Sequence, residues 1–231
     1  MRIRAAFFDV GDTLVEHWLR GDELAGIHRR DLVAAFGERD WYDELVAADI
    51  KPTEREPHRQ ETNRWYEEWF AARGIACDID IDRLRSAFAG PIELLSTPVP
   101  GAADAVRWCK AQQLRVVLVT NTLYRGDAEV MRDWERAGLS DAIDAVVTSH
   151  SAGWEKPHPA IYRRALELAR CEAGEAFMVG DDPECDIKGA QSLGLRAIWR
   201  RTADQRLPAG VCPDAILDHM GQLADVVRAW L

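Results

Sequence analysis

Residues 3–14 read IRAAFFDVGDTL, and this segment sets the architecture that the rest of the chain follows. The span Ile3–Val10 is largely apolar rather than alternating, and Gly11 comes directly after it. Continuous apolar runs are typical of strands that helices cover on both faces. We therefore expect a buried strand at Ile3–Val10, with Asp9 near its carboxyl end.

Similar short runs recur along the chain. They predict strands at Arg115–Thr120, Ala145–Ser149 and Phe177–Gly180, with weaker signals at Arg196–Trp199 and Ala215–Leu217. Helical patterns separate them, at Ala102–Gln113, Asp127–Ala137, Pro159–Ala169 and Asp186–Leu193. Strands and helices that alternate in this way indicate an α/β fold built on a parallel sheet.

The stretch from Glu16 to Thr97 breaks the alternation, because it is polar, helical in pattern and without a convincing buried strand. We expect residues 1–15 and 98–231 to form the α/β core and residues 16–97 to form an inserted helical cap. The insertion carries Trp18, Trp41, Trp65 and Trp69. Because Trp65 and Trp69 are four apart, they share a helix face, and these rings are expected to form the core of the cap itself. A second interpretation places one ring at a substrate pocket.

Composition narrows the classes of function. Of the 231 residues, 47% are hydrophobic and 29% charged, which is typical of a globular protein. A net charge of -10 argues against nucleic acid as the main partner, because such binders need a basic face. The start of the chain lacks a signal-peptide pattern, and no apolar stretch is long enough for a membrane span. Five scattered cysteines without Cys-x-x-Cys pairing predict reduced thiols and a cytoplasmic location.

Ligands of open α/β sheets bind beyond the carboxyl ends of the strands, so the polar residues at those ends predict the site. After the expected strands come five acidic residues and several hydrogen-bonding groups, with one lysine in a loop ahead of a helix. They are Asp9, Gly11, Asp12, Thr13, Thr120, Asn121, Gly180, Asp181, Asp182, Asp186 and Lys156. Taken singly, Asp12 and Asp182 are explained equally well as turn or helix-capping residues.

These residue types fit one kind of chemistry. Carboxylates at one edge repel each other unless a cation lies among them, and Mg²⁺ prefers carboxylate oxygens while leaving positions for water and phosphate. A carboxylate nucleophile would divide the displacement at phosphorus into two easier steps. Thr120 and Asn121 can donate to phosphate oxygens, and Lys156 can offset charge on the transferred group.

The same segments resemble the four motifs of the haloacid dehalogenase-like superfamily. The first is Phe8–Leu14, the second Val116–Asn121, the third Lys156–Pro159 and the fourth Gly180–Asp186. The resemblance implies a Rossmann-like core with a helical cap and phosphoryl transfer that depends on Mg²⁺. It implies Asp9 as nucleophile and Thr120 and Lys156 as phosphoryl-binding groups. The metal ligands that it implies are Asp9, the carbonyl of Gly11, Asp181 and Asp186, the last directly or through water.

One position departs from the family pattern. Phosphatases of this family usually carry a second Asp two residues after the nucleophile, as general acid and base, and here that residue is Gly11. A positioned acid contributes roughly a hundred- to ten-thousand-fold to the rate. Its loss should slow the departure of poor leaving groups, unless Asp12, a cap residue or water takes its place.

The sequence leaves alternatives beside an Mg²⁺-dependent hydrolase of a small phosphorylated metabolite. A 2-haloacid dehalogenase needs the Asp nucleophile but no metal, which leaves Asp181 unexplained. A phosphonoacetaldehyde hydrolase needs a cap lysine for a Schiff base, and Lys51 is the lysine in residues 16–97. A binding or regulatory member of the fold with little activity is favoured by Gly11, but Asp9, Lys156 and Asp181 argue against it.

The expected partner is a small phosphorylated molecule, and the residues that select it are expected in the cap. The candidates that could face the site are Trp18, Arg20, Arg55, His58, Arg59 and Arg64. Most arginines in a polar helical segment lie on the surface. One or two that point inward would favour a substrate with a second anionic group. The pattern predicts no particular oligomeric state.

Overall fold

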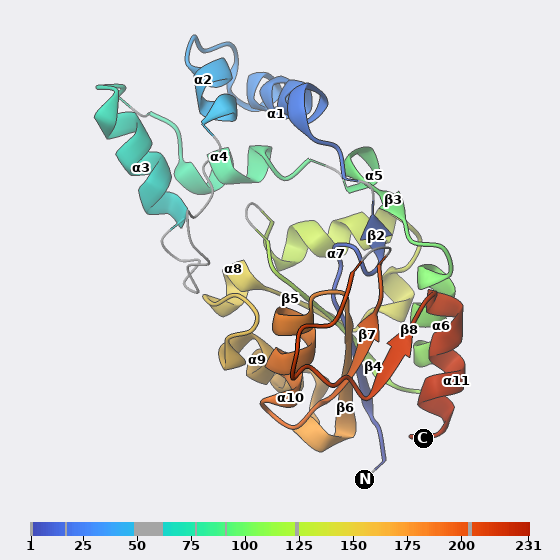
Figure 1. Ribbon diagram of the computed structural model, residues 1–231. Helices are drawn as coiled ribbons and strands as arrows, with labels where there is room; N and C mark the ends of the chain where they lie inside the picture. Colours follow the sequence, from blue (N-terminus) through green and yellow to red (C-terminus); the bar gives the residue numbers. More distant parts are fainter. Residues whose placement is uncertain are drawn as a thin grey trace.

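A computed structural model describes residues 2–16, 18–48, 62–76, 78–90, 92–122, 125–202 and 205–231. Within these residues it contains a six-stranded sheet in the order β5-β4-β1-β6-β7-β8, in which every neighbouring pair is parallel (Figure 1). The strands are β1 (Ala5–Phe8), β4 (Arg115–Thr120), β5 (Ala145–Thr148), β6 (Ala176–Gly180), β7 (Arg196–Arg200) and β8 (Ala215–Leu217). The predicted α/β fold class is confirmed.

Strand β1 lies in the centre of the sheet because its side chains are apolar on both faces. Phe8 pairs with Leu118 of β4 on one side and with Val179 of β6 on the other. Phe8 joins one hydrophobic cluster and Phe7 joins the cluster on the opposite face. The parallel register brings the carboxyl ends of β1, β4 and β6 to one edge of the sheet.

Helices cover both faces. The face with Phe8 packs against α6 (Ala102–Ala111), α7 (Asp127–Arg136) and α11 (Leu223–Arg228). The face with Phe7 packs against α9 (Pro159–Ala169), the π-helical segment η4 (Pro183–Lys188) and α10 (Gly189–Gln191). Shorter helices are α8 (Ser149–Ala152) and the 3₁₀ turns η2 (Ser140–Ala142), η3 (Ala173–Glu175) and η5 (Met220–Gln222).

The predicted helix Asp186–Leu193 is wrong in its start and in its type. The helical segment begins earlier, at Pro183, and continues as α10 only to Gln191. Asp182 caps it, since its Oδ1 accepts from the backbone N–H groups of Glu184 and Cys185 at 2.8 and 2.9 Å. An N-cap followed directly by proline is a helix-start signal that places the first turn before Asp186.

Between residues 18 and 96, the regular secondary structure that the structure describes is helical. It contains α1 (Gly21–Phe36), α2 (Tyr42–Ala47), α3 (Thr62–Ala72), α4 (Ile81–Ala87) and α5 (Ile92–Leu95). Its apolar side chains form a third cluster of their own, which includes Leu32, Tyr42, Leu84 and Phe88. This separate cluster supports the predicted division into residues 1–15, 16–97 and 98–231, which stays a prediction.

The cap tryptophans lie in different environments. Trp41 and Trp69 belong to the third cluster, as predicted. Trp65 is half-buried, whereas Tyr66 and Phe70 of the same helix are buried in this cluster. Trp18 packs instead against the cluster of the α/β core. The four rings therefore do not form one aromatic core.

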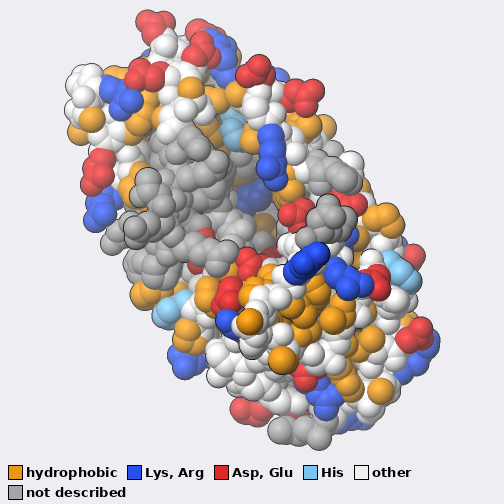
Figure 2. Space-filling model, viewed as in Figure 1, with side chains coloured by type: hydrophobic (Ala, Val, Ile, Leu, Met, Phe, Trp, Pro, Cys, Tyr) orange, Lys and Arg blue, Asp and Glu red, His pale blue; other side chains and the backbone are white. Residues whose placement is uncertain are grey.

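A two-stranded antiparallel ribbon, which the sequence pattern did not predict, joins the two parts. Strand β2 (Val15–Glu16) pairs with β3 (Thr97–Pro98), so the chain leaves and re-enters the core at one place (Figure 1). On the face shown in Figure 2, acidic and basic side chains are interspersed over both parts. Among the described residues, none of the helices has the length and apolar character that a membrane span requires.

Candidate active site

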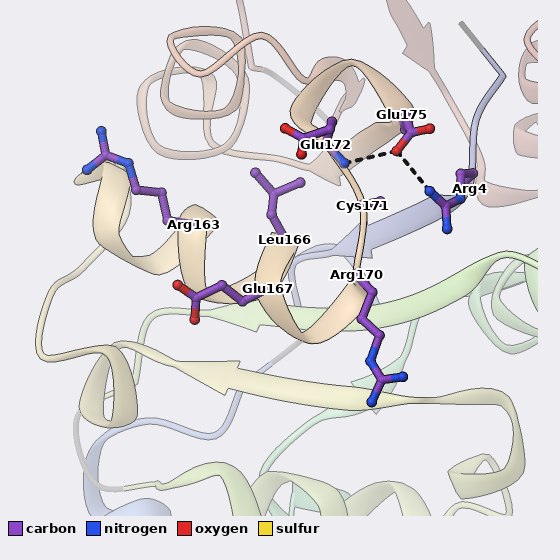
Figure 3. Close-up of a pocket in the computed structure, with 8 residues that line it drawn as sticks. All are labelled: Arg4, Arg163, Leu166, Glu167, Arg170, Cys171, Glu172 and Glu175. Atoms are coloured by element: carbon purple, nitrogen blue, oxygen red, sulfur yellow. Dashed lines mark hydrogen bonds and ion pairs between the residues drawn. The ribbon is translucent and has the colours of Figure 1, made fainter.

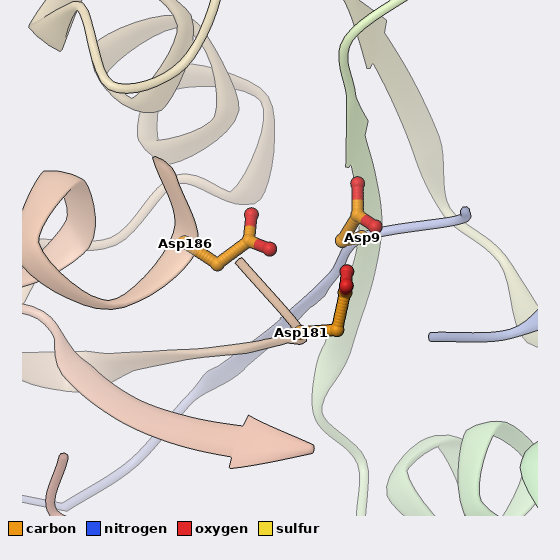
Figure 4. A group of neighbouring side chains, drawn as sticks. All are labelled: Asp9, Asp181 and Asp186. Carbon is orange, nitrogen blue, oxygen red and sulfur yellow. The ribbon is translucent and has the colours of Figure 1, made fainter. Parts of the chain in front are cut away.

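Three acidic side chains meet at the carboxyl edge of the central strands. Asp9 follows β1, Asp181 follows β6, and Asp186 reaches the same place from η4. Figure 4 shows their carboxylates turned toward one shared space, and one ligand oxygen from each lies within 4.8 Å of the others. Asp9 and Asp186 are 7% and 1% exposed, so water cannot screen their charges well.

Lys156 lies between two of these carboxylates. Its ammonium Nζ donates to Oδ1 of Asp9 at 2.5 Å and to Oδ1 of Asp186 at 2.7 Å, and the side chain is 2% exposed. Lys156 therefore engages one oxygen of the Asp9 carboxylate, Oδ1. A lysine held in this way supplies positive charge at the atom where a phosphoryl group would be transferred.

The backbone of Lys156 is fixed by the loop after β4. Asn121 accepts from the Lys156 N–H at 2.8 Å through Oδ1 and donates to the Lys156 carbonyl at 3.1 Å through Nδ2. The side chain of Asn121 therefore positions the lysine in this structure, and its predicted contact with phosphate stays a prediction. Thr120, which is 5% exposed, ends β4 directly beside the β1 edge. Its predicted phosphate contact also stays a prediction.

The pKa values of the Asp181 and Asp186 carboxyl groups are raised, as expected where negative charges outnumber positive ones. Burial and, to a smaller extent, the charges of Asp9 and Asp186 together raise the pKa of Asp181 to about 8. Burial also raises the pKa of Asp186 to about 7, although Lys156 opposes the increase. Burial alone would lower the pKa of Lys156, but Asp186 and Asp9 raise it above its ordinary value.

The donor set fits Mg²⁺. Three carboxylates and one ammonium carry two uncompensated negative charges when all are ionised, and a divalent cation would balance them. Oxygen donors from a few carboxylates are the ligands that Mg²⁺ prefers in proteins. Asp9, Asp181 and Asp186 would hold the ion, while the predicted use of the Gly11 carbonyl as a further ligand stays a prediction.

Two side chains of β7 support the site, and the sequence interpretation missed both. The Trp199 indole Nε1–H donates to the carbonyl of Asp181 at 2.8 Å. Arg200 donates to the carbonyl of Asp12 at 2.5 Å and to Oε2 of Glu16 at 2.8 Å, which ties the loop after β1 to the start of the ribbon. The weak strand signal at Arg196–Trp199 could have indicated them, because the carboxyl end of this strand lies at the same edge of the sheet as the three carboxylates.

Several proposed cap residues can be placed. Trp18 is half-buried next to Gly11, whereas Arg20 and Arg64 are exposed. Lys51, Arg55, His58 and Arg59 lie outside the described residues.

A surface groove lies at the other end of the sheet. It has a volume of ≈ 460 Å³ and is lined by residues that include Arg4, Arg163 and Arg170 (Figure 3). Arg4 precedes β1 and Asp9 follows it, so the groove and the carboxylates lie at opposite edges. Arg4 also donates to the carboxylate of Glu175 at 3.1 Å, and this ion pair partly neutralises the charge of the guanidinium. This groove is separate from the candidate active site.

Gly180 makes the position of Asp186 possible. A Cβ atom at Gly180 would lie 2.2 Å from Cγ of Asp186, far inside van der Waals contact. Glycine inside a strand often marks such a close approach. The Asp186 carboxylate can enter the edge of the sheet only because residue 180 has no side chain.

Gly180→Ala is therefore expected to destabilise the protein by about 1–3 kcal/mol or more, as overpacking does in a tight core, and to displace Asp186. Chemical denaturation measures the change in unfolding free energy. Gly26→Ala is the matched control, since Gly26 is exposed within α1 and a Cβ there meets nothing within 4 Å. That control should gain about 0.5–1 kcal/mol. Equal effects of the two substitutions would contradict the close packing.

The parallel sheet and the buried carboxylate–lysine group define a class of α/β enzyme that acts at the carboxyl edge of the sheet. The model of the haloacid dehalogenase-like hydrolases matches residues 3–194. The chain belongs to this family of hydrolases.

Two relatives and one solved structure are similar to this chain. Glyceraldehyde 3-phosphate phosphatase of Pyrococcus furiosus is 26% identical, and the match covers 98% of this chain and 94% of that protein. Human haloacid dehalogenase-like hydrolase domain-containing protein 3 is 36% identical, over 42% of this chain and 37% of that protein. The crystal structure of 2-haloacid dehalogenase from Pseudomonas syringae pv. Tomato DC3000 has a TM-score of 0.64 at 24% identity, and covers 99% of this chain and 100% of that one.

Proposed function

We propose that this hydrolase is a phosphatase that cleaves a small phosphate monoester with the help of Mg²⁺, through an aspartyl-phosphate at Asp9. The observation that carries the proposal is the buried group in which Lys156 bonds to Asp9 and Asp186 with Asp181 alongside. The full-length match to a protein named as a phosphatase supports the choice of phosphate over other substrates.

In the first step, Oδ2 of Asp9 attacks phosphorus, the new O–P bond forms, and the ester O–P bond breaks. The leaving oxygen takes a proton from water. In the second step, water attacks phosphorus, the Asp9 O–P bond breaks, and phosphate is released with the Asp9 carboxylate restored. Lys156 holds Oδ1 of Asp9 throughout and offsets charge on the transferred group. When bound, Mg²⁺ would supply further positive charge at the phosphoryl oxygens.

Dehalogenation is the second candidate, favoured by the absence of a carboxylate at Gly11. Hydrolysis of p-nitrophenyl phosphate with and without Mg²⁺ separates the two, because nitrophenolate leaves without help from an acid. The phosphatase proposal expects phosphate release that Mg²⁺ stimulates and EDTA removes. Chloride release from 2-chloropropionate without metal, together with no phosphate release, would favour the dehalogenase instead.

Mg²⁺ is expected to raise the thermal unfolding midpoint, and to raise it more at pH 8 than at pH 6. The pKa values of Asp181 and Asp186 are raised in the folded state from 3.8 to about 8 and about 7, so stability falls as the pH rises through this range. Mg²⁺ binds the ionised carboxylates and removes this loss. A hundredfold excess over Kd contributes about 2.7 kcal/mol.

Thermal unfolding at the two pH values, with Mg²⁺ and with EDTA, measures the effect. Asp181→Asn should lose most of the Mg²⁺-dependent increase. Asp218→Asn is the control, because Asp218 is exposed and pairs with Arg201 away from the site. An increase of the same size in Asp181→Asn and in the wild type would show that Mg²⁺ stabilises the protein elsewhere.

A further inference from the structure

The segment that enters the cap is held firmly next to the active edge. On one side of Trp18, Glu16 pairs with Thr97 in the ribbon β2–β3. The side-chain Oε2 of Glu16 also accepts a hydrogen bond from Arg200 at 2.8 Å. On the other side, the N–H of Leu19 donates to the carbonyl of Leu95 at 2.7 Å. These contacts fix the backbone on both sides of Trp18.

The indole lies against Gly11 in the loop after β1. A Cβ atom at Gly11 would lie 3.7 Å from Cζ2 and 3.8 Å from Nε1 of Trp18. Both are ordinary van der Waals distances, and the φ angle of Gly11 lies outside the left-handed region. The backbone therefore does not require glycine here. Because Gly11 has no side chain, the Trp18 ring occupies the space beside the loop.

The Trp18 ring packs on the loop that carries Asp9, since Gly11 is two residues beyond Asp9. The attacking and leaving oxygens of a phosphoryl transfer lie roughly in line through phosphorus. Attack from Asp9, at the end of β1, therefore directs the leaving group away from the sheet and toward the chain that enters the cap. Trp18 is part of that chain and is two residues beyond the ribbon.

We propose that Trp18 is a specificity-determining residue, whose indole forms the wall against which the leaving group packs. This inference rests on the proposed phosphatase function. The ring occupies the space that a longer side chain at position 11 would enter. Such a wall favours apolar, planar leaving groups and gives them no carboxylic acid from position 11, so the rate depends on the acidity of the leaving group itself.

The first test compares p-nitrophenyl phosphate with glycerol phosphate in the wild type, Trp18→Phe and Trp18→Ala. Trp18→Ala is expected to raise KM for the aryl ester roughly three- to tenfold and to change KM for the glycerol ester much less, since only the aryl group loses ring packing. Trp18→Phe should recover most of the aryl preference. An equal change for both esters would overturn the proposal.

The second test uses phenyl phosphate, whose leaving group is a weak acid. Gly11→Asp alone should gain little in kcat, because the indole fills the space for the new carboxylate. Gly11→Asp combined with Trp18→Ala should exceed Trp18→Ala alone by about tenfold or more, since a positioned acid contributes on this scale. If Gly11→Asp raised kcat equally with and without the indole, Trp18 would not occupy the space of the new carboxylate.

The Mg²⁺-dependent rise in unfolding midpoint, measured on each variant, shows that fold and metal site are intact. If the wild type does not hydrolyse p-nitrophenyl phosphate, the proposed function fails. If it does, and neither Trp18 variant alters the preference between esters, only the role of Trp18 fails.

Discussion

Asp9→Asn is expected to lower kcat for p-nitrophenyl phosphate by about 10⁴-fold or more, the scale on which enzymes lose activity with their nucleophile. An amide oxygen can still accept from Lys156, but a neutral amide is a poor nucleophile toward phosphorus. The substitution keeps the shape of the side chain, and the residue is buried, at 7% exposed. The fold should therefore persist, and the loss should appear in kcat far more than in the unfolding midpoint.

Asp12→Asn is the matched control for this prediction. Asp12 is close to Asp9 in the chain and has a positive φ of 52°, a conformation that Asn adopts as readily as Asp. Arg200 contacts its backbone carbonyl, which the substitution keeps. Its kcat should change by less than about tenfold, below the range of a lost general acid. With phenyl phosphate, whose leaving group is a weak acid, a hundredfold loss in Asp12→Asn would instead assign the acid to Asp12.

Lys156→Met is expected to have the largest effect on stability, a loss of about 3–5 kcal/mol, because it leaves two buried carboxylates without their ammonium. Activity should also fall, by about 10²–10³-fold, as when one charge-stabilising donor is lost. Without Lys156, the pKa of Asp186 rises further, because the lysine no longer opposes the effect of burial. The stability loss should therefore be largest above pH 8 and smaller near pH 5.

A second substitution separates the two effects of Lys156. Lys156→Met with Asp186→Asn removes one buried charge along with its partner, so part of the lost stability should return while activity stays low. Urea denaturation and p-nitrophenyl phosphate hydrolysis measure the two properties on the same samples. If the double variant is no more stable than Lys156→Met alone, the ion pair is not what the lysine contributes.

Much of the candidate site at the carboxyl edge of the sheet could be predicted, because short local patterns of apolar residues show where a strand ends. The apolar run before Asp9 fixes a buried strand, and parallel strands bring their carboxyl ends to one edge. Asp9 and Asp181 could therefore be placed together without coordinates. Asp186 was also predicted correctly as a neighbour, although its helix was not. The π-helical start at Pro183 and the missing side chain of Gly180 bring its carboxylate inward.

Contacts between distant segments could not be predicted in the same way. Nothing local to Asn121 shows that its amide will bond to the backbone of Lys156, 35 residues away. The contact between Arg200 and the loop at Asp12 joins the two ends of the fold, and the packing of Trp18 on Gly11 depends on the ribbon β2–β3. Such pairings follow from the tertiary arrangement, which a pattern of residue types along one chain does not contain.

Trapping of the phosphorylated enzyme tests the role of Asp9 most directly. The wild type is mixed with Mg²⁺ and p-nitrophenyl phosphate, quenched in acid within one turnover, digested, and examined by peptide mass spectrometry. We predict one phosphoryl group on the peptide that contains Asp9, sensitive to hydroxylamine as an acyl phosphate is, and missing from Asp9→Asn. Turnover that leaves this peptide unmodified, or a phosphoryl group on a different residue, would contradict the assignment of Asp9 as nucleophile.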